Sequence, residues 1–153
     1  MSNARQLKKE NMRSVIQVIR NSDAFTKPEI AQATGLTGAT VHSIILELEE
    51  RGLLDKCGFS CSNGGRKAQL YKVANDYRYV VGMALRTNKI VIGIFDFCMK
   101  MLCEKSYEWM LGDHSVEETV HAMNEFFLEL VEENGLKRDK IVAVGVNVPG
   151  PVD

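Results

Sequence analysis

The sequence predicts two successive units: an α+β unit of three helices and a β-hairpin, then an α/β unit with the element order βββαβ. Apolar residues recur at helical spacing up to about residue 52, and short strand-like runs replace that pattern afterwards. Charge also changes along the chain. Residues 1–75 carry 11 Lys and Arg against 7 Asp and Glu, whereas residues 76–153 carry 8 against 13. We therefore expect a basic unit over residues 1–75, suited to a polyanion, and an acidic unit over residues 76–153.

The first two helices follow from periodicity and capping. Between Gln6 and Arg20, apolar residues fall at broadly helical intervals, which predicts an amphipathic helix. The sequence "NSDAF" interrupts it. In "TKPEIAQATG", Thr26 followed three residues later by Glu29 forms a capping box, which predicts the start of a second helix. Gly35 stands where a left-handed residue would end that helix.

The third helix is expected to begin after Thr37, which can accept a hydrogen bond from the first turn, and to end at Gly52. Its inward positions are Val41, Ile44 and Leu48. After it, "LLDKCGFS" and "AQLYKV" read as two strands joined by "CSNGGRK", with the hairpin tip near residues 63–67. Three helices followed by such a hairpin form a winged helix-turn-helix.

The spacing of small and branched residues supports a helix-turn-helix. Ala31 has little bulk at the expected crossing of the helices, Gly35 allows a positive φ in the turn, and Val41 anchors the next helix. This leaves a set of small or polar residues on the exposed first turns of the third helix. They are Gly38, Ala39, Thr40, His42 and Ser43.

Such small side chains would let the helix backbone approach double-stranded DNA in a major groove about 12 Å wide. Thr40, His42 and Ser43 can donate hydrogen bonds to phosphates or base edges, and the helix N-terminus beside Thr37 favours an anion. Arg66 and Lys67, on the hairpin tip, can reach a minor groove or flanking phosphates. Three alternatives stay open. The three helices could serve protein contact or form a core with no ligand, which the apolar Leu46 favours slightly. The basic turn could be merely solvated, and His42 could be a polar surface residue that contacts no DNA.

In the second unit, "YVVGMALR", "KIVIGIFDF" and "MLCEKSYEW" predict three strands, the first two joined through Thr87 and Asn88. Ser115 and Glu118 form a second capping box, and a helix is expected from Val116 to Glu133. Gly135 ends it, and "IVAVGVNV" predicts a strand buried on both faces. We expect an α/β domain that is incomplete at residue 153. The expected apolar stripe of the helix is Val120, Met123, Phe127, Leu130 and Val131.

Composition narrows the class of protein further. The chain is 45% hydrophobic and 25% charged, with neither an apolar run long enough to span a membrane nor a signal-peptide pattern. Four cysteines in such a chain suggest reduced thiols in a cytoplasm. Cys57 and Cys61 could be metal ligands, but no second pair follows at zinc-site spacing. We therefore expect no metal or other cofactor in these residues.

Four blocks, in this order, resemble the ROK family of bacterial transcriptional regulators and sugar kinases, specifically its regulator branch. They are "KKENMRSVIQVIR", "PEIAQATGLTGATVHSIILELEERGLL", "GGRKAQLYKV" and "VGVNVPGPVD". The resemblance implies a MarR-like winged helix followed by the start of an actin-like, ribonuclease H-like ATPase fold. It also implies a dimeric, sugar-responsive repressor of carbohydrate genes, with a sugar or sugar-phosphate effector bound in a later part of the protein.

The resemblance also raises the possibility of a sugar kinase with an accessory winged helix. In kinases of the family, the first hairpin carries an Asp, two glycines and a Thr that hold nucleotide phosphates and metal. The corresponding positions here are Ala84, Arg86, Thr87 and Asn88. Because phosphoryl transfer depends on positioning and charge neutralisation, this loss argues against catalysis. The chain is therefore expected not to be an enzyme.

Overall fold

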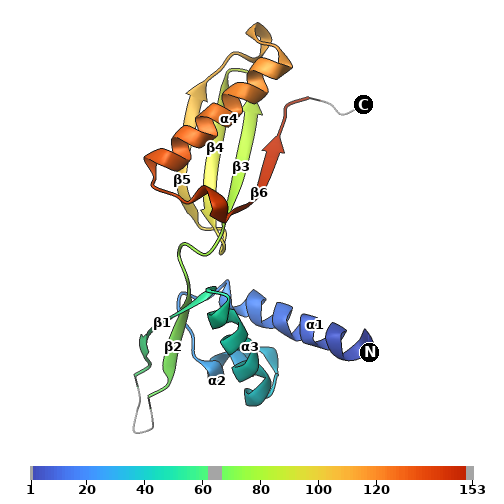
Figure 1. The fold of residues 1–153 in the computed structure, drawn as a ribbon, viewed down its shortest axis with the longest axis vertical. Coiled ribbons are helices and arrows are strands. Elements are labelled where there is room, and N and C mark those ends of the chain that lie inside the picture. Colours follow the sequence, from blue (N-terminus) through green and yellow to red (C-terminus); the bar gives the residue numbers. More distant parts are fainter. Residues whose placement is uncertain (1, 62–66, 151–153) are drawn as a thin grey trace. The chain divides into compact units, whose positions relative to one another are not determined.

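The computed structural model describes residues 2–61 and 67–150, and their side chains from Ala4 onward. The chain divides into two compact units, Met1–Tyr77 and Arg78–Asp153, which we call unit 1 and unit 2. Figure 1 shows that unit 1 is built from helices and a hairpin and that unit 2 is built from a sheet and a helix.

Unit 1 contains three helices and a two-stranded antiparallel hairpin. Its first helix begins four residues earlier than the periodicity indicated, because the apolar pattern marks only the part of the helix that packs on the core. The elements are α1 (Ser2–Ile19), α2 (Lys27–Thr34), α3 (Gly38–Glu50), β1 (Leu54–Phe59) and β2 (Gln69–Val73).

Local capping sets the limits of α2 and α3, as the sequence predicted. The Thr26 hydroxyl accepts a hydrogen bond from the Glu29 amide, and the Glu29 carboxylate accepts one from the Thr26 amide at 2.7 Å, which completes the capping box. Gly35 ends α2 with φ 69°, and Gly52 follows α3 with φ 71°. Thr37 caps α3 by accepting from the Thr40 amide at 3.2 Å. The turn between the two helices is therefore confirmed.

The hairpin is tied to the helices by a third extended segment. Phe25, just before α2, exchanges two backbone hydrogen bonds with Tyr71 of β2, at 2.9 and 2.8 Å. A bulge between Lys56 and Gly58 interrupts the pairing of β1 with β2. The expected hairpin tip, residues 63–67, lies outside the described residues except for Lys67. The core beneath is apolar and includes Val15, Ile19, Phe25, Ile30, Val41, Ile44, Ile45, Leu48, Leu53, Leu54 and Tyr71.

Unit 2 is a four-stranded mixed sheet with one long helix. The strand order is β5-β4-β3-β6, with β6 parallel to β3 and the other pairs antiparallel. This matches the predicted βββαβ order. The elements are β3 (Tyr79–Arg86), β4 (Lys89–Asp96), β5 (Met101–Glu108), α4 (Val116–Glu133) and β6 (Ile141–Asn147), with short 3-10 turns at Leu111–Asp113 and Arg138–Lys140.

The helix α4 covers one face of the sheet, as Figure 1 shows. Met123, Phe127, Leu130 and Val131 pack against the buried side chains of β3 and β4. Val120, which we expected in this stripe, is instead 61% exposed. The start of α4 packs through Thr119, whose hydroxyl lies 3.3 Å from the indole nitrogen of Trp109, and this orientation turns Val120 outward.

The expectation that β6 is buried on both faces was wrong. Only its first residue is half-buried, and Val144 is 51% exposed. The strand stands at the edge of the sheet, where β3 is its one neighbour, and among the described residues α4 packs over the middle strands. A run of apolar residues favours burial, but the elements that pack on the strand decide whether burial occurs.

Candidate nucleic-acid interface

The first two turns of α3 carry the residues that the sequence singled out. Val41, Ile44, Ile45 and Leu48 are buried against the unit 1 core, and this orients the opposite side of the helix outward. The outward residues are Gly38, Ala39, His42 and Ser43, all exposed, and Thr40, which is half-buried.

Two features of this helix start suit an outside partner. A Cβ added at Gly38 would meet no described atom within 4 Å, so internal packing does not require a glycine there. The Thr37 and Thr40 hydroxyls lie 2.9 Å apart and share a hydrogen bond, which places two hydroxyls beside the free amides of the helix N-terminus. The result is an accessible backbone with hydrogen-bonding groups around it.

His42 has a partner that the sequence reasoning missed. Its Nδ1 lies 2.9 Å from the Nζ of Lys27, which is the first residue of α2. The same ammonium lies 5.3 Å from the centre of the Tyr71 ring in β2. One signal was present in the sequence: Lys27 directly follows the Thr26 cap, so its place at the helix start was predictable, although its neighbour on α3 was not.

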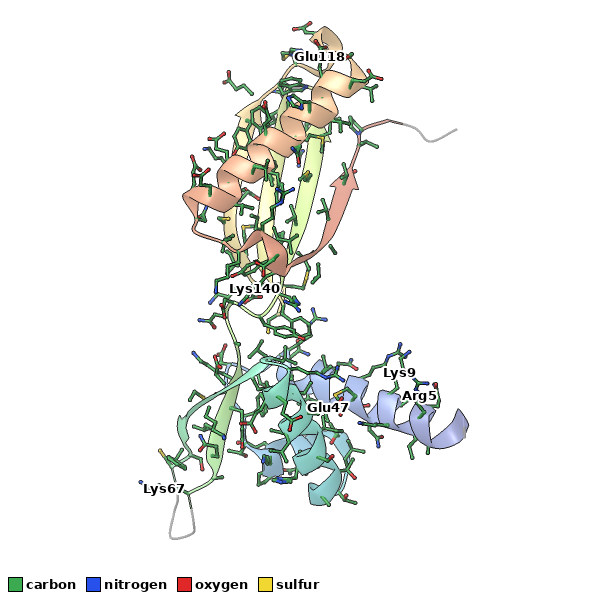
Figure 2. All side chains as sticks on the ribbon, in the orientation of Figure 1. Arg5, Lys9, Glu47, Lys67, Glu118 and Lys140 are labelled. Atoms are coloured by element: carbon green, nitrogen blue, oxygen red, sulfur yellow. The ribbon has the colours of Figure 1, made fainter. Side chains whose placement is uncertain are left out.

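The wing residues are only partly described. Lys67 is exposed and stands two residues before β2, where the described part of the hairpin stops in Figure 2. Beside it, the Ser60 amide donates to the Ala68 carbonyl at 2.8 Å, which closes this level of the hairpin. Arg66, the other predicted wing residue, lies outside the described residues. Lys67 is therefore presented next to the tip, as a wing contact would require.

The second half of α3 is acidic, but internal ion pairs neutralise part of this charge. Glu47 accepts from Lys8 of α1 at 2.8 Å and also pairs with Arg51. The hydrogen bond from Lys8 is the largest cause that lowers the pKa of Glu47. Glu49 pairs with Lys56 of β1 at 3.1 Å. Paired carboxylates repel a polyanion less than free ones, so α3 keeps a face that DNA could approach.

A row of cations on α1 also escaped the sequence reasoning. Arg5, Lys9 and Arg13 lie four residues apart on one helix face, and with Lys8 and Arg51 they line an open groove of about 810 Å³. Figure 2 shows Arg5 and Lys9 on α1, apart from Lys67 on the wing. Like charges at this spacing weaken an isolated helix by a few tenths of a kcal/mol. An anion bound at this surface would offset that repulsion, so the row suits a surface that meets an anion.

The turn of unit 2 that would hold phosphates in a kinase is hydrogen-bonded to the segment that follows β5. Thr87 and Asn88 join β3 to β4, and their carbonyls accept from the amides of Leu111 and Trp109 at 3.0 and 3.1 Å. Among the described residues, no group of three or more His, Cys, Asp or Glu is arranged to hold a metal ion. No described helix combines the length and apolar character that crossing a membrane requires.

Unit 1 is therefore a helix-turn-helix with a wing hairpin. This class of module places a helix in a DNA groove. Residues 15–56 match the family described as the IclR helix-turn-helix domain. The DNA-binding transcriptional dual regulator NagC of Escherichia coli (strain K12) is 26% identical over 147 residues, which cover 96% of this chain and 36% of NagC.

Two further similar proteins are named as a repressor and as a transcriptional regulator. The xylose repressor of Staphylococcus xylosus is 27% identical over 116 residues, 74% of this chain and 30% of the repressor. A crystal structure of a ROK family transcriptional regulator, a homologue of the E. coli MLC protein, has a TM-score of 0.63 at 17% identity, over 94% of this chain and 36% of that one. The chain is thus a homologue of the ROK-family regulators, and it spans about a third of the length of these relatives.

Proposed function

We propose that this chain is the DNA-binding part of a transcriptional regulator, acting in the cytoplasm as a sugar-responsive repressor of carbohydrate genes. The observation that carries the proposal is the exposed start of α3, where Gly38 and Ala39 leave the backbone open and Thr40, His42 and Ser43 offer hydrogen bonds. Homology to regulators named as DNA-binding or as repressors supports it.

In this proposal, α3 enters the major groove with its N-terminal end forward. The Thr37 and Thr40 hydroxyls and the first amides of the helix contact a phosphate, because the positive end of the helix dipole favours an anion. His42 and Ser43 meet base edges or phosphates, and Arg66 and Lys67 grip the flanking backbone from the wing. The cations of α1 add attraction that does not depend on sequence.

The partners follow the same reasoning. The xylose repressor and a further relative, the N-acetylglucosamine repressor of Escherichia coli O6:H1, which is 26% identical over 147 residues, are both named for sugars. We therefore infer a sugar or sugar-phosphate effector for the protein to which this chain belongs. A homodimer would read two half-sites separated by about one helical turn of DNA or a multiple of it. Effector binding would shift the paired winged helices out of register with adjacent grooves, which couples the two ligands.

The main enzymatic alternative is a sugar kinase with an accessory winged helix. The turn at Thr87 and Asn88 lacks the glycine pair that would let phosphate approach the backbone amides. The purified full-length protein to which this chain belongs should therefore fail to phosphorylate sugars with ATP. Sugar-dependent ADP release at a rate above the no-enzyme control would establish the kinase instead.

Gel-shift titration on the DNA upstream of its own gene tests the regulator. Ala39→Glu should abolish binding, because it places a carboxylate at the proposed groove contact. The fold should tolerate it, since acidic residues stabilise a helix N-terminus. Asn124→Glu, at an exposed position of α4, is the matched charge control.

The salt dependence of binding gives the second readout. Wild-type affinity that falls steeply with salt supports the proposal. Absence of binding at low salt, or full binding by Ala39→Glu, would favour a protein-contact module.

A further inference from the structure

Three elements of unit 1 converge on one ammonium group. Lys27 opens α2, and its Nζ lies 2.9 Å from Nδ1 of His42 on α3 and 5.3 Å from the ring centre of Tyr71 on β2. We propose that Lys27 holds the proton of neutral His42 on Nε2, so that the outward edge of the ring is a hydrogen-bond donor. His42 would then select an acceptor on DNA. This inference rests on the proposed function for its DNA part, but not for its proton part.

The position of Lys27 is determined by the fold. It follows Thr26, a buried cap whose hydroxyl and amide both bond to Glu29. Tyr71 is also buried, and it is bonded through its backbone to Phe25, two residues before Lys27. Lys27 itself is half-buried. A side chain anchored at its backbone and over an aromatic ring loses little further entropy when it meets His42, so the contact is favoured.

The chemistry of the two groups decides where the proton lies. An ammonium has three donors and no lone pair, so it can only donate. Nδ1 must therefore be the acceptor, and in a neutral imidazole the remaining hydrogen is on Nε2. Because Lys27 can only donate to Nδ1, the tautomer of the neutral ring with Nε2–H is favoured.

The consequence is that His42 would prefer groups on DNA that accept a hydrogen bond. An Nε2–H group can bond to N7 or O6 of guanine, O4 of thymine, N7 of adenine or a phosphate oxygen, but it cannot accept from the amino group of cytosine or adenine. Lys27 acts here as a positioning residue, since it would set the polarity of the contact through His42. Its own phosphate contact, if made, would be independent of base sequence.

The proton part is tested without DNA by long-range ¹H–¹⁵N spectra of the 153-residue chain at pH 8, where imidazole is ordinarily neutral. Loss of one signal in His42→Gln assigns the ring. We expect the Nε2–H form in wild type, a mixture of both forms in Lys27→Met, and the Nδ1–H form in Lys27→Glu, because a carboxylate can only accept. Lys27→Arg, which can still donate, should match wild type. A wild-type ring that carries its proton on Nδ1, or identical spectra in all four proteins, would overturn the inference.

The DNA part uses a double-mutant cycle on the upstream fragment and on single base-pair variants of it. Lys27→Met should reduce the preference for the best base pair at the His42 position by about tenfold, the size of one hydrogen-bond contact. In a His42→Ala background it should leave that preference unchanged, and only the salt slope should fall, by about one if a phosphate contact is lost. If Lys27→Met lowered the base preference equally in the wild-type and His42→Ala backgrounds, Lys27 would not act through His42. That result would overturn the inference even if the protein binds DNA as proposed.

Discussion

The two units bury their apolar surface in different ways. Unit 1 wraps three helices and a hairpin around one core, and among its described residues it leaves three large apolar side chains exposed, Leu7, Leu46 and Phe59. Unit 2 places one helix on one face of a sheet, and ten such side chains remain exposed among the residues up to 150. They are Met99, Met101, Leu102, Met110, Val116, Val120, Val142, Val144, Val146 and Val148.

The difference has a physical cause. This chain spans about a third of its relatives' length. The described part of unit 2 has a single helix that covers part of one face of a sheet, whereas the three helices of unit 1 enclose their apolar stripes. Unit 1 therefore has a surface that is mostly polar, and its small and basic residues are available for recognition. The exposed strand β6 of unit 2 is apolar on both sides and suits packing, not recognition of a polyanion.

The charges of the units follow the same division. Unit 1 is basic, and its α3 carboxylates Glu47 and Glu49 are paired with Lys8 and Lys56. Unit 2 is acidic, and Lys105 of β5 bridges Glu129 and Glu133 of α4 at 2.7 Å each. Four substitutions or titrations test how far the two units differ, from the largest expected effect to the smallest.

Leu48→Ala should destabilise unit 1 by roughly 2–5 kcal/mol, because it removes a buried side chain and leaves a cavity in an enclosed core. Denaturant unfolding followed by circular dichroism measures the loss. The control is Leu46→Ala on the same helix, where the side chain is 43% exposed and the change should stay within about 0.5 kcal/mol. Equal effects of the two substitutions would contradict the closed core of unit 1.

The matching capping boxes of α2 and α4 allow a direct comparison of the units. Thr26→Ala should cost about 1–2 kcal/mol, since the cap is buried and its removal leaves the Glu29 amide without its partner. Ser115→Ala removes the same bond at an exposed site, where water can replace it, and should cost less than about 1 kcal/mol. Thermal unfolding of both variants is the measurement. A larger loss for Ser115→Ala would show that burial does not decide the strength of the cap.

The cations of the two units should differ in their effect on DNA. Lys9→Gln should lower affinity for any DNA sequence by about two- to threefold at low salt, and the difference should fade as salt rises. Lys100→Gln, an exposed cation in the β4–β5 turn of unit 2, is the matched control and should change nothing. Filter binding to unrelated DNA at several salt concentrations provides the test. Equal losses for both variants would mean that overall charge, and not the α1 row, provides the attraction.

The smallest expected effect is a pH dependence in unit 2. The hydrogen bond from Lys105 lowers the pKa of Glu129 below its ordinary value of 4.5. A carboxyl whose folded pKa is lowered stabilises the fold above the unfolded value, and this contribution is lost as pH falls through the folded pKa. Glu129→Gln should therefore flatten the loss of stability below pH 4.5. Melting temperatures between pH 6 and pH 3 measure this. An acid limb that stays as steep as in wild type would exclude Glu129 as a contributor.

Local features were predictable from sequence because they depend on residues three or four apart. The caps at Thr26, Thr37 and Ser115 and the left-handed Gly35 each satisfy backbone groups in their own turn, so no distant residue can change them. The same reasoning predicted the two hairpins and the βββαβ order of elements along the chain. It also chose the exposed positions of α3, whose contact with DNA stays a prediction.

What the sequence determined by itself was where the capped helices α2, α3 and α4 begin, since those limits depend on hydrogen bonds between near neighbours. Tertiary structure alone decided that β6 stands at a bare sheet edge, that Val120 points outward, and that Lys27 reaches a histidine fifteen positions away. Each of these outcomes depends on which surfaces pack together. Packing joins residues that are far apart in the chain, and a pattern along the chain carries no record of the distance between them in space.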